Sequence, residues 1–160
     1  MRRIAPLLLF LQIIVLGGCS SIDCQLNSTV YSKYVLAGPV SMLDDTLSVI
    51  AHREGRPDSL LLNRLVNATD FIIPLSYTQP VDVLYFTLTD NLSVTRTDTV
   101  RISKTDQPHF ESIDCTPSYF HTLTGAEWTS HAIDSIIITN SKVTYDTTGG
   151  HLRIYFRARD

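Results

Sequence analysis

The chain has 160 residues, of which 44% are hydrophobic and 18% charged, and its formal net charge is −3. That hydrophobic content is typical of a folded protein and excludes a disordered chain. With 13 basic residues against 16 acidic ones, the composition argues against nucleic acid as a partner.

The chain begins with two arginines and an apolar segment, Ile4 to Leu16. This segment is too short to span a bilayer, which takes about 20 residues, and its proportions are those of a signal peptide. It ends in Leu16-Gly17-Gly18-Cys19, which resembles the bacterial lipobox. The resemblance implies that residues 1–18 are removed and that the thiol of Cys19 carries lipid. The alternative is an ordinary signal peptide, with Cys19 as part of the mature fold.

Lipidation at Cys19 predicts attachment to a membrane of the cell envelope, because two or three acyl chains bind stably where one binds only marginally. Residues 19–28 would form a short tether and residues 29–160 a single domain. Without residues 1–18 the chain has 11 basic and 16 acidic residues, a formal charge of −5. Ser20 follows the lipidated residue, and by the sorting rule of enterobacterial lipoproteins this implies the outer membrane. The leaflet and the face stay open.

If Cys19 carries lipid, Cys24 and Cys115 are the two remaining cysteines. In an oxidising compartment two cysteines predict one internal disulfide. Two free thiols and an intermolecular bridge are the alternatives. The two cysteines lack the close spacing that zinc sites use, so no metal site is predicted.

From Thr29 onward, short segments rich in β-branched and aromatic residues alternate with turn residues, which is typical of strands. Leu60–Val66 has one or two helical turns as an alternative, and Pro74 predicts an edge strand or a bulge. The pattern predicts an all-β protein, an antiparallel two-sheet β-sandwich of the immunoglobulin type. A small lipocalin-like β-barrel is the alternative, since strand number does not separate the two. The candidate strands are 30–36, 46–51, 59–62, 71–73, 81–89, 92–95 continuing to 99–103, 109–113, 119–123, 133–139, 143–145 and 151–156.

An Asp-Ser/Thr pair followed by an aliphatic residue or Thr occurs five times, and the first four copies open predicted strands. An aspartate that ends a turn by bonding to nearby backbone accounts for the pattern. The tripeptide also resembles the O-glycan acceptor of exported Bacteroidetes proteins. On that interpretation the candidate acceptors are Thr46, Ser59, Thr99, Ser135 and Thr147.

Several segments together resemble a family of small uncharacterised Bacteroidetes lipoproteins. The segments are the lipobox, Cys24 to Tyr31, Asp58 to Asn63, His109 to Cys115 and Ile133 to Ile136. The resemblance implies a single all-β periplasmic or surface domain with an unassigned role, and it brings no catalytic residues.

The sequence contains none of the short catalytic, metal-binding or phosphate-binding motifs for which we searched. The five histidines form no H-x-H or H-E-x-x-H array, no Gly-x-Ser-x-Gly elbow is present, and no phosphate-binding loop occurs. We therefore expect no enzyme and no cofactor. Trp128, the only tryptophan, is the candidate ligand contact, because with Tyr119 and His131 it could stack on a sugar ring or anchor a protein. The alternative is that Trp128 plugs one end of the sandwich.

These observations predict a lipid-anchored, non-catalytic envelope protein that binds another envelope protein or a glycan. An adhesin or pilus-type subunit is one alternative, with 151–156 as a detachable strand. A carrier of a small apolar ligand is another, and a hydrolase is the last.

Overall fold

The computed structural model describes Cys24 and residues 29–158. The predicted signal peptide, the predicted lipidation site Cys19 and most of the predicted tether lie outside the described residues.

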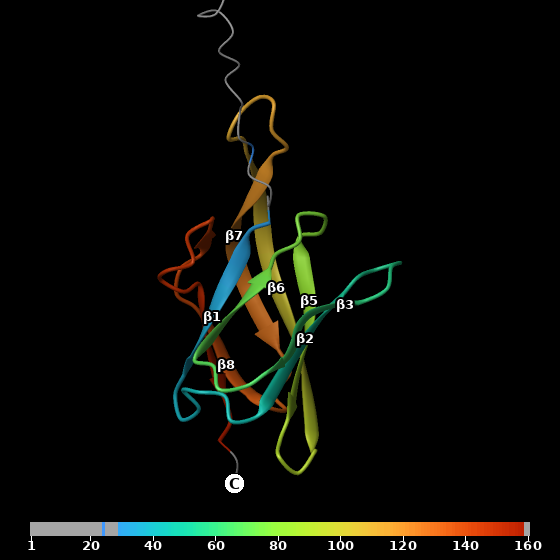
Figure 1. The fold of residues 1–160 in the computed structure, drawn as a ribbon, viewed down its shortest axis with the longest axis vertical. Coiled ribbons are helices and arrows are strands. Elements are labelled where there is room, and N and C mark those ends of the chain that lie inside the picture. Colours follow the sequence, from blue (N-terminus) through green and yellow to red (C-terminus); the bar gives the residue numbers. More distant parts are fainter. Residues whose placement is uncertain (1–23, 25–28, 159–160) are drawn as a thin grey trace, which may run out of the picture.

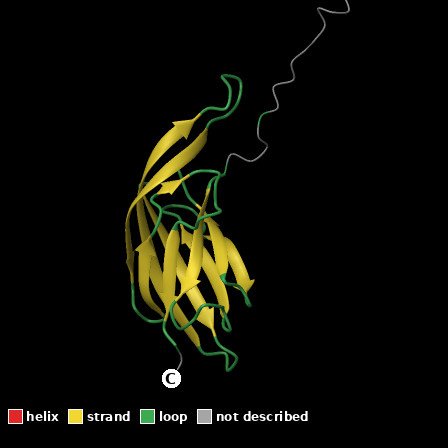
Figure 2. Cartoon of the chain, turned by 90° about the vertical axis from the view of Figure 1, so that its left-hand side faces the viewer, coloured by secondary structure: helices red, strands yellow, loops and turns green. Residues whose placement is uncertain are grey.

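The described residues form ten strands and no helix (Figures 1 and 2). Alternation of buried and exposed side chains runs through most strands, as the sequence pattern predicted. In Val81–Thr89, for example, Leu84, Phe86 and Leu88 are buried and the residues between them are half-buried. The strands are β1 (Tyr31–Ala37), β2 (Thr46–His52), β3 (Ser59–Leu65), β4 (Asp70–Pro74), β5 (Val81–Thr89), β6 (Thr95–His109), β7 (Ser118–Trp128), β8 (Ile133–Ile138), β9 (Lys142–Val143) and β10 (Leu152–Phe156).

The strands make two packed sheets, so the predicted β-sandwich is confirmed. One sheet has the order β4-β1-β10-β8 and the other the order β3-β2-β5-β6-β7-β9. Among the described strands, the pairing is antiparallel except between β1 and β10, which run parallel. One continuous apolar core fills the space between the sheets. At its centre the rings of Tyr34 and Phe71 stack with centroids 5.0 Å apart.

Four local predictions are wrong, and the first is the strand 143–145, of which only Val143 lies in a strand, β9. Residues 92–94 form a turn instead of a strand, because Oδ1 of Asp90 accepts hydrogen bonds from the main-chain N–H groups of Leu92 and Val94. Only the first residue of 109–113 belongs to a strand, the end of β6. The helical alternative for Leu60–Val66 is also wrong, because β3 pairs with β2 through an irregular register.

The six-stranded sheet bends beside the first residue of β5. Val81, at the start of β5, pairs with Ser103 of β6, and the register between β6 and β7 shifts between Ser103 and Lys104. Such a bulge bends a strand and increases its twist. Beyond the bulge, β6 and β7 continue as a long hairpin that rises past the other strands (Figure 2). We call residues 104–123 the hairpin arm, with the loop 110–117 at its tip.

Candidate functional site

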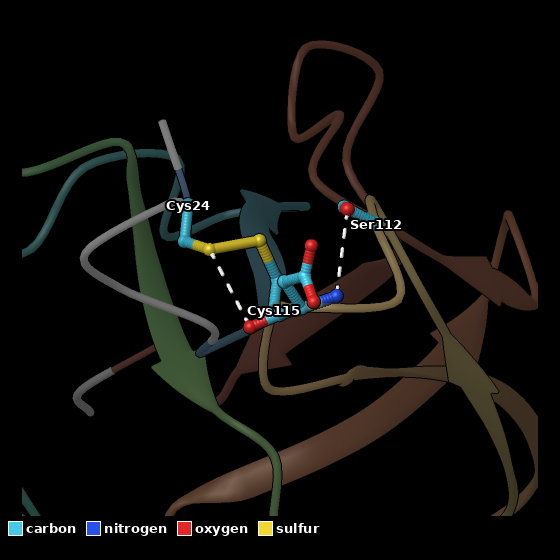
Figure 3. The surroundings of a disulfide bond; sticks show 4 residues. Cys24, Ser112 and Cys115 are labelled. Carbon is cyan, nitrogen blue, oxygen red and sulfur yellow. Dashed lines mark hydrogen bonds between the residues drawn. A yellow bond between two sulfur atoms is a disulfide. The ribbon is translucent and has the colours of Figure 1, made fainter. Parts of the chain in front are cut away.

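A disulfide joins Cys24 to Cys115 in the loop of the hairpin arm (Figure 3). The two Cα atoms lie 5.5 Å apart although 91 positions separate the residues. The carbonyl oxygen of Asp114 lies 4.0 Å from the sulfur of Cys24. The predicted internal pairing is therefore confirmed over free thiols or an intermolecular bridge. It fixes the chain at residue 24 to the tip of the arm.

The surface of the described part of the chain has a groove of about 650 Å³. It lies between the turn that joins β2 to β3 and the loop that joins β4 to β5 (teal and green in Figure 1). We call it the groove, and its lining includes His52, Arg53, Arg56, Leu75, Ser76, Tyr77, Gln79 and Asp82. A second hollow, of about 220 Å³, is lined by Leu75, Tyr77, Tyr119 and His121 among others. Leu75 and Tyr77 therefore form the wall between the two hollows.

Tyr77 presents an aromatic platform at this wall. Its ring stacks on that of Tyr119, with centroids 4.5 Å apart and planes within 8° of each other, yet Tyr77 remains 60% exposed. The stack joins the β4–β5 loop to the hairpin arm. One face of Tyr77 is thereby held in place by a neighbouring ring, and the side chain lines both hollows.

Polar groups lie on the floor of the groove. The carboxylate of Asp82 accepts hydrogen bonds from the main-chain N–H of Ser76 at 3.2 Å and from the amide of Gln79 at 3.4 Å. Burial raises the pKa of Asp82, and the ammonium group of Lys104 opposes that rise. The hydroxyl of Ser76 lies 2.8 Å from that of Thr78. The groove thus combines an aromatic ring with hydroxyl, amide and carboxyl groups, the usual makeup of a site that orients a polar ligand.

Beneath the groove a buried charged cluster occupies the bend of the sheet. The ammonium group of Lys104 is inaccessible to solvent and lies 3.7 Å from both Asp82 and Asp106. It also donates a hydrogen bond to the carbonyl of Gln79 at 2.6 Å. Asp106 lies 2.7 Å from Nδ1 of His121, whose side chain faces the second hollow. Through these contacts Lys104 ties the arm to Asp82 of β5 and to Gln79 of the β4–β5 loop.

This cluster was missed by the sequence interpretation, although a signal was present. Asp82 continues the inward-facing series of Leu84, Phe86 and Leu88, and Lys104 continues the series of Val100 and Ile102. A charged residue at an inward position of a strand must find a partner, because an unpaired buried charge is costly. Two such positions on neighbouring strands could have indicated a buried ion pair.

Trp128 and Tyr119 do not form one site. Trp128 ends β7 and pairs with Val100, whereas Tyr119 lies near the start of the same strand and pairs with Pro108. Trp128 is half-buried against the core, and its indole N–H donates to the carbonyl of Asp134 at 3.2 Å. His131 lies beside Asp98, 3.3 Å from its carboxylate. Tyr77, which sequence reasoning overlooked, is the aromatic neighbour of Tyr119.

The five candidate glycan acceptors are spread over the fold and are all partly exposed. Thr46 and Ser59 open β2 and β3 as predicted, whereas Thr99 and Ser135 lie inside β6 and β8. Thr147 lies in the segment before β10. Their modification stays a prediction.

Within the described residues, no three histidine, cysteine, aspartate or glutamate side chains are grouped so that they could hold a metal ion. The same residues contain no helix of the length and apolarity needed to cross a membrane.

Residues 46–156 match a family described as "Family of unknown function (DUF6452)". Neither a curated protein nor a solved structure matches the chain.

Proposed function

The chain belongs to the family of unknown function DUF6452, and we propose that it is a lipid-anchored, non-catalytic lipoprotein of the cell envelope, of Bacteroidetes type, that binds a glycan in the groove beside Tyr77. The observation that carries the binding proposal is the exposed ring of Tyr77, held by Tyr119 next to the polar floor of the groove.

The N-terminal sequence and the disulfide support the envelope location. A disulfide persists in oxidising compartments such as the periplasm and the cell surface, and Cys24–Cys115 is formed. The segment ending in Leu16-Gly17-Gly18-Cys19 supplies an export signal and a thiol for lipid. The outer membrane remains the favoured location on the sorting rule for Ser20.

The chemistry of the groove favours a glycan over the other ligands considered. A sugar ring has an apolar face that stacks on an aromatic side chain and hydroxyl groups that need hydrogen-bond partners. Tyr77 offers the ring, and Ser76, Gln79 and Asp82 offer the partners. A carrier of an apolar ligand needs a hollow apolar interior, whereas apolar side chains fill this core.

A pilus-type role would require a strand that can detach. The strand considered for this, β10, lies between β1 and β8 in the middle of its sheet. Its removal would divide that sheet, so the pilus-type alternative receives no support from the topology. Binding of another envelope protein remains the competing role for the groove.

The anchoring proposal is tested by expressing Cys19→Ala in a lipoprotein-processing host. The unchanged protein should sediment with membranes and have the mass of residues 19–160 plus acyl chains. Cys19→Ala should lose both properties. Equal membrane partitioning of the two proteins would reject the anchor.

Glycan binding is tested with the full-length protein in detergent, using purified sacculi, lipopolysaccharide and N-acetylglucosamine oligomers as probes. We expect one of these probes to bind. Tyr77→Ala should weaken that binding roughly tenfold or more, because the stacking surface is lost. Tyr77→Phe should retain most of it, and Leu92→Ala, on an exposed turn elsewhere, should bind normally. Binding unaffected by Tyr77→Ala, or no binding of any probe, would reject the glycan site.

A further inference from the structure

The loop at the tip of the hairpin arm exposes two large apolar side chains. Ile113 is 96% exposed and Phe110 is 60% exposed, and both lie in the loop 110–117 that follows β6. The sequence pattern predicted a strand here because of these apolar residues. The structure leaves them on the surface, at the end of the molecule that lies farthest from the C-terminus (Figure 1).

The disulfide places the start of the domain beside these two side chains. Cys115 is two positions from Ile113 in sequence and is bonded to Cys24 (Figure 3). Cys19 precedes Cys24 by five residues, and five residues reach at most about 17 Å even when fully extended. An acyl chain on Cys19 is therefore attached within about 17 Å of Cys24, whose Cα lies 5.5 Å from that of Cys115 in the loop at the tip.

We propose that the tip of the hairpin arm rests on the lipid bilayer, with Phe110 and Ile113 inserted at the level of the headgroups and upper acyl chains. This inference rests on the proposed lipid anchor at Cys19. The anchor holds the loop at the membrane surface, where a high effective concentration lets a small apolar contact persist. Interfacial elements insert their apolar side chains about 5–10 Å into this region.

The charges of the loop select the kind of lipid surface. Glu111 and Asp114 are both acidic, and the carboxylate of Glu111 lies 3.3 Å from the ring of His109. The loop carries no lysine or arginine from residue 110 to 117. Anionic lipid would therefore not strengthen the contact, and a zwitterionic headgroup layer is the surface that fits. The proposed contact therefore differs from the binding of a basic protein patch to anionic lipid.

The contact would also orient the domain. Anchoring through Cys19 alone leaves the domain free to rotate about its tether. A second contact through Phe110 and Ile113 would set the long axis of the molecule upright on the membrane. The turn between β5 and β6, with Leu92 and Val94, then points away from the lipid, as does the C-terminus (Figure 1).

The experiment uses the acylated full-length protein in vesicles of phosphatidylcholine with brominated acyl chains. Ile113→Trp and Phe110→Trp each add an indole at the tip, and Leu92→Trp adds one at the far turn. After subtraction of the emission of Trp128 measured in the unchanged protein, bromine should quench the indoles at positions 110 and 113 and leave the one at position 92 unquenched. Phosphatidylglycerol added to the vesicles should not increase the quenching.

The outcomes separate this inference from the anchor. If the protein floats with the vesicles and position 113 is quenched no more than position 92, the anchor stands and the loop contact is rejected. If neither the unchanged protein nor Cys19→Ala floats, both are rejected. Ile113→benzoylphenylalanine in native membranes gives a second readout. A photo-adduct with lipid supports the contact, whereas an adduct with a protein assigns the loop to a protein partner and overturns it.

Discussion

The main-chain N–H of Lys33 donates a hydrogen bond to Nδ1 of His151, 2.9 Å away and 118 positions later in the chain. The main-chain N–H of His151 in turn donates to the carbonyl of Lys33 at 2.8 Å. His151 is 1% exposed. Its Nδ1 can accept the first bond only while it carries no proton. The junction between β1 and the approach to β10 therefore requires a neutral imidazole.

This requirement predicts how stability depends on pH. Burial lowers the pKa of His151 from its ordinary value of 6.5, although Asp146 partly opposes the shift. Below pH 6.5 the unfolded chain takes up a proton that the folded chain refuses, so stability falls as the pH drops through this range. His151→Gln keeps a hydrogen-bond acceptor and removes the titration. Its free energy of unfolding, measured by denaturant between about pH 5 and 8, should show a shallower slope. An unchanged slope would contradict the role of His151.

Asp98 organises the connection between β7 and β8. Its carboxylate is fully buried and accepts hydrogen bonds from the Thr129 hydroxyl and from the main-chain N–H groups of His131, Ala132 and Ile133 at 2.7–2.8 Å. Burial alone would raise the pKa of Asp98, but these hydrogen bonds outweigh it and lower the pKa. The stability that Asp98 supplies is therefore present above its ordinary pKa of 3.8 and is lost at more acidic pH.

Asp98→Asn should destabilise the fold by at least about 3 kcal/mol, because an amide cannot accept all of these bonds and each unpaired buried donor costs about 1–3 kcal/mol. Asp134 is the matched control, since it begins the same tripeptide pattern but its side chain is exposed. Asp134→Asn should change stability by less than about 0.5 kcal/mol. Denaturant melts of the two variants measure the difference, and similar losses would count against the proposed role of Asp98.

Gly150 permits the tight approach of the last turn to β1. Its φ is +71°, and a Cβ placed there would lie 2.7 Å from Cγ2 of Val35. Gly150→Ala should cost about 1–2 kcal/mol for the backbone conformation alone, plus the displacement of Val35. Gly149 has nothing within 4 Å of an added Cβ, so Gly149→Ala should be neutral or slightly stabilising. The midpoint temperature of unfolding should therefore fall for Gly150→Ala and stay the same or rise slightly for Gly149→Ala. Equal changes in the two midpoints would exclude this explanation.

Lys104 is held between two carboxylates at the bend, so its removal leaves like charges together. Lys104→Met should destabilise the protein by about 3–5 kcal/mol, the usual cost of removing one partner of a buried ion pair. Asp82→Asn combined with Lys104→Met should recover part of that loss. Lys142→Met, at an exposed position in β9, is the control and should be close to neutral. Unfolding by denaturant supplies all three values, and a fully stable Lys104→Met would show that the cluster is dispensable.

The sequence predicts the structure correctly where the pattern of nearby residues, or the number of cysteines, decides it. The bounds of β5 were predicted because every second residue from Asp82 to Leu88 faces the core. The disulfide could be predicted because the lipidation predicted for Cys19 leaves only two other cysteines. The bounds of β6 and of the loop that follows it could not be predicted in this way. Phe110 and Ile113 have strand propensity, but no strand among the described residues pairs with them, so tertiary context prevailed over propensity.

The groove could not be predicted because its walls come from separate parts of the chain. The turn after His52 and the loop around Tyr77 are brought together only by the order of strands in the two sheets. The partner of Tyr77 lies on β7, more than forty positions later. Single-sequence patterns specify which residues face inward, but they contain no information on which strands are neighbours. The sequence points to Trp128 because it is the only tryptophan. The exposed ring at the groove belongs instead to Tyr77, a more common residue type in a polar loop.

The parallel pairing of β1 with β10 has a consequence for biogenesis. Because β10 separates β1 from β8, the smaller sheet cannot assemble until Leu152–Phe156 are available. Pairing between strands that are so far apart in the sequence slows folding. A chain threaded through a translocation pore in an extended state could thus complete this sheet only after β10 has emerged. Deletion of the final strand should yield a trapped, protease-sensitive species rather than a smaller stable domain.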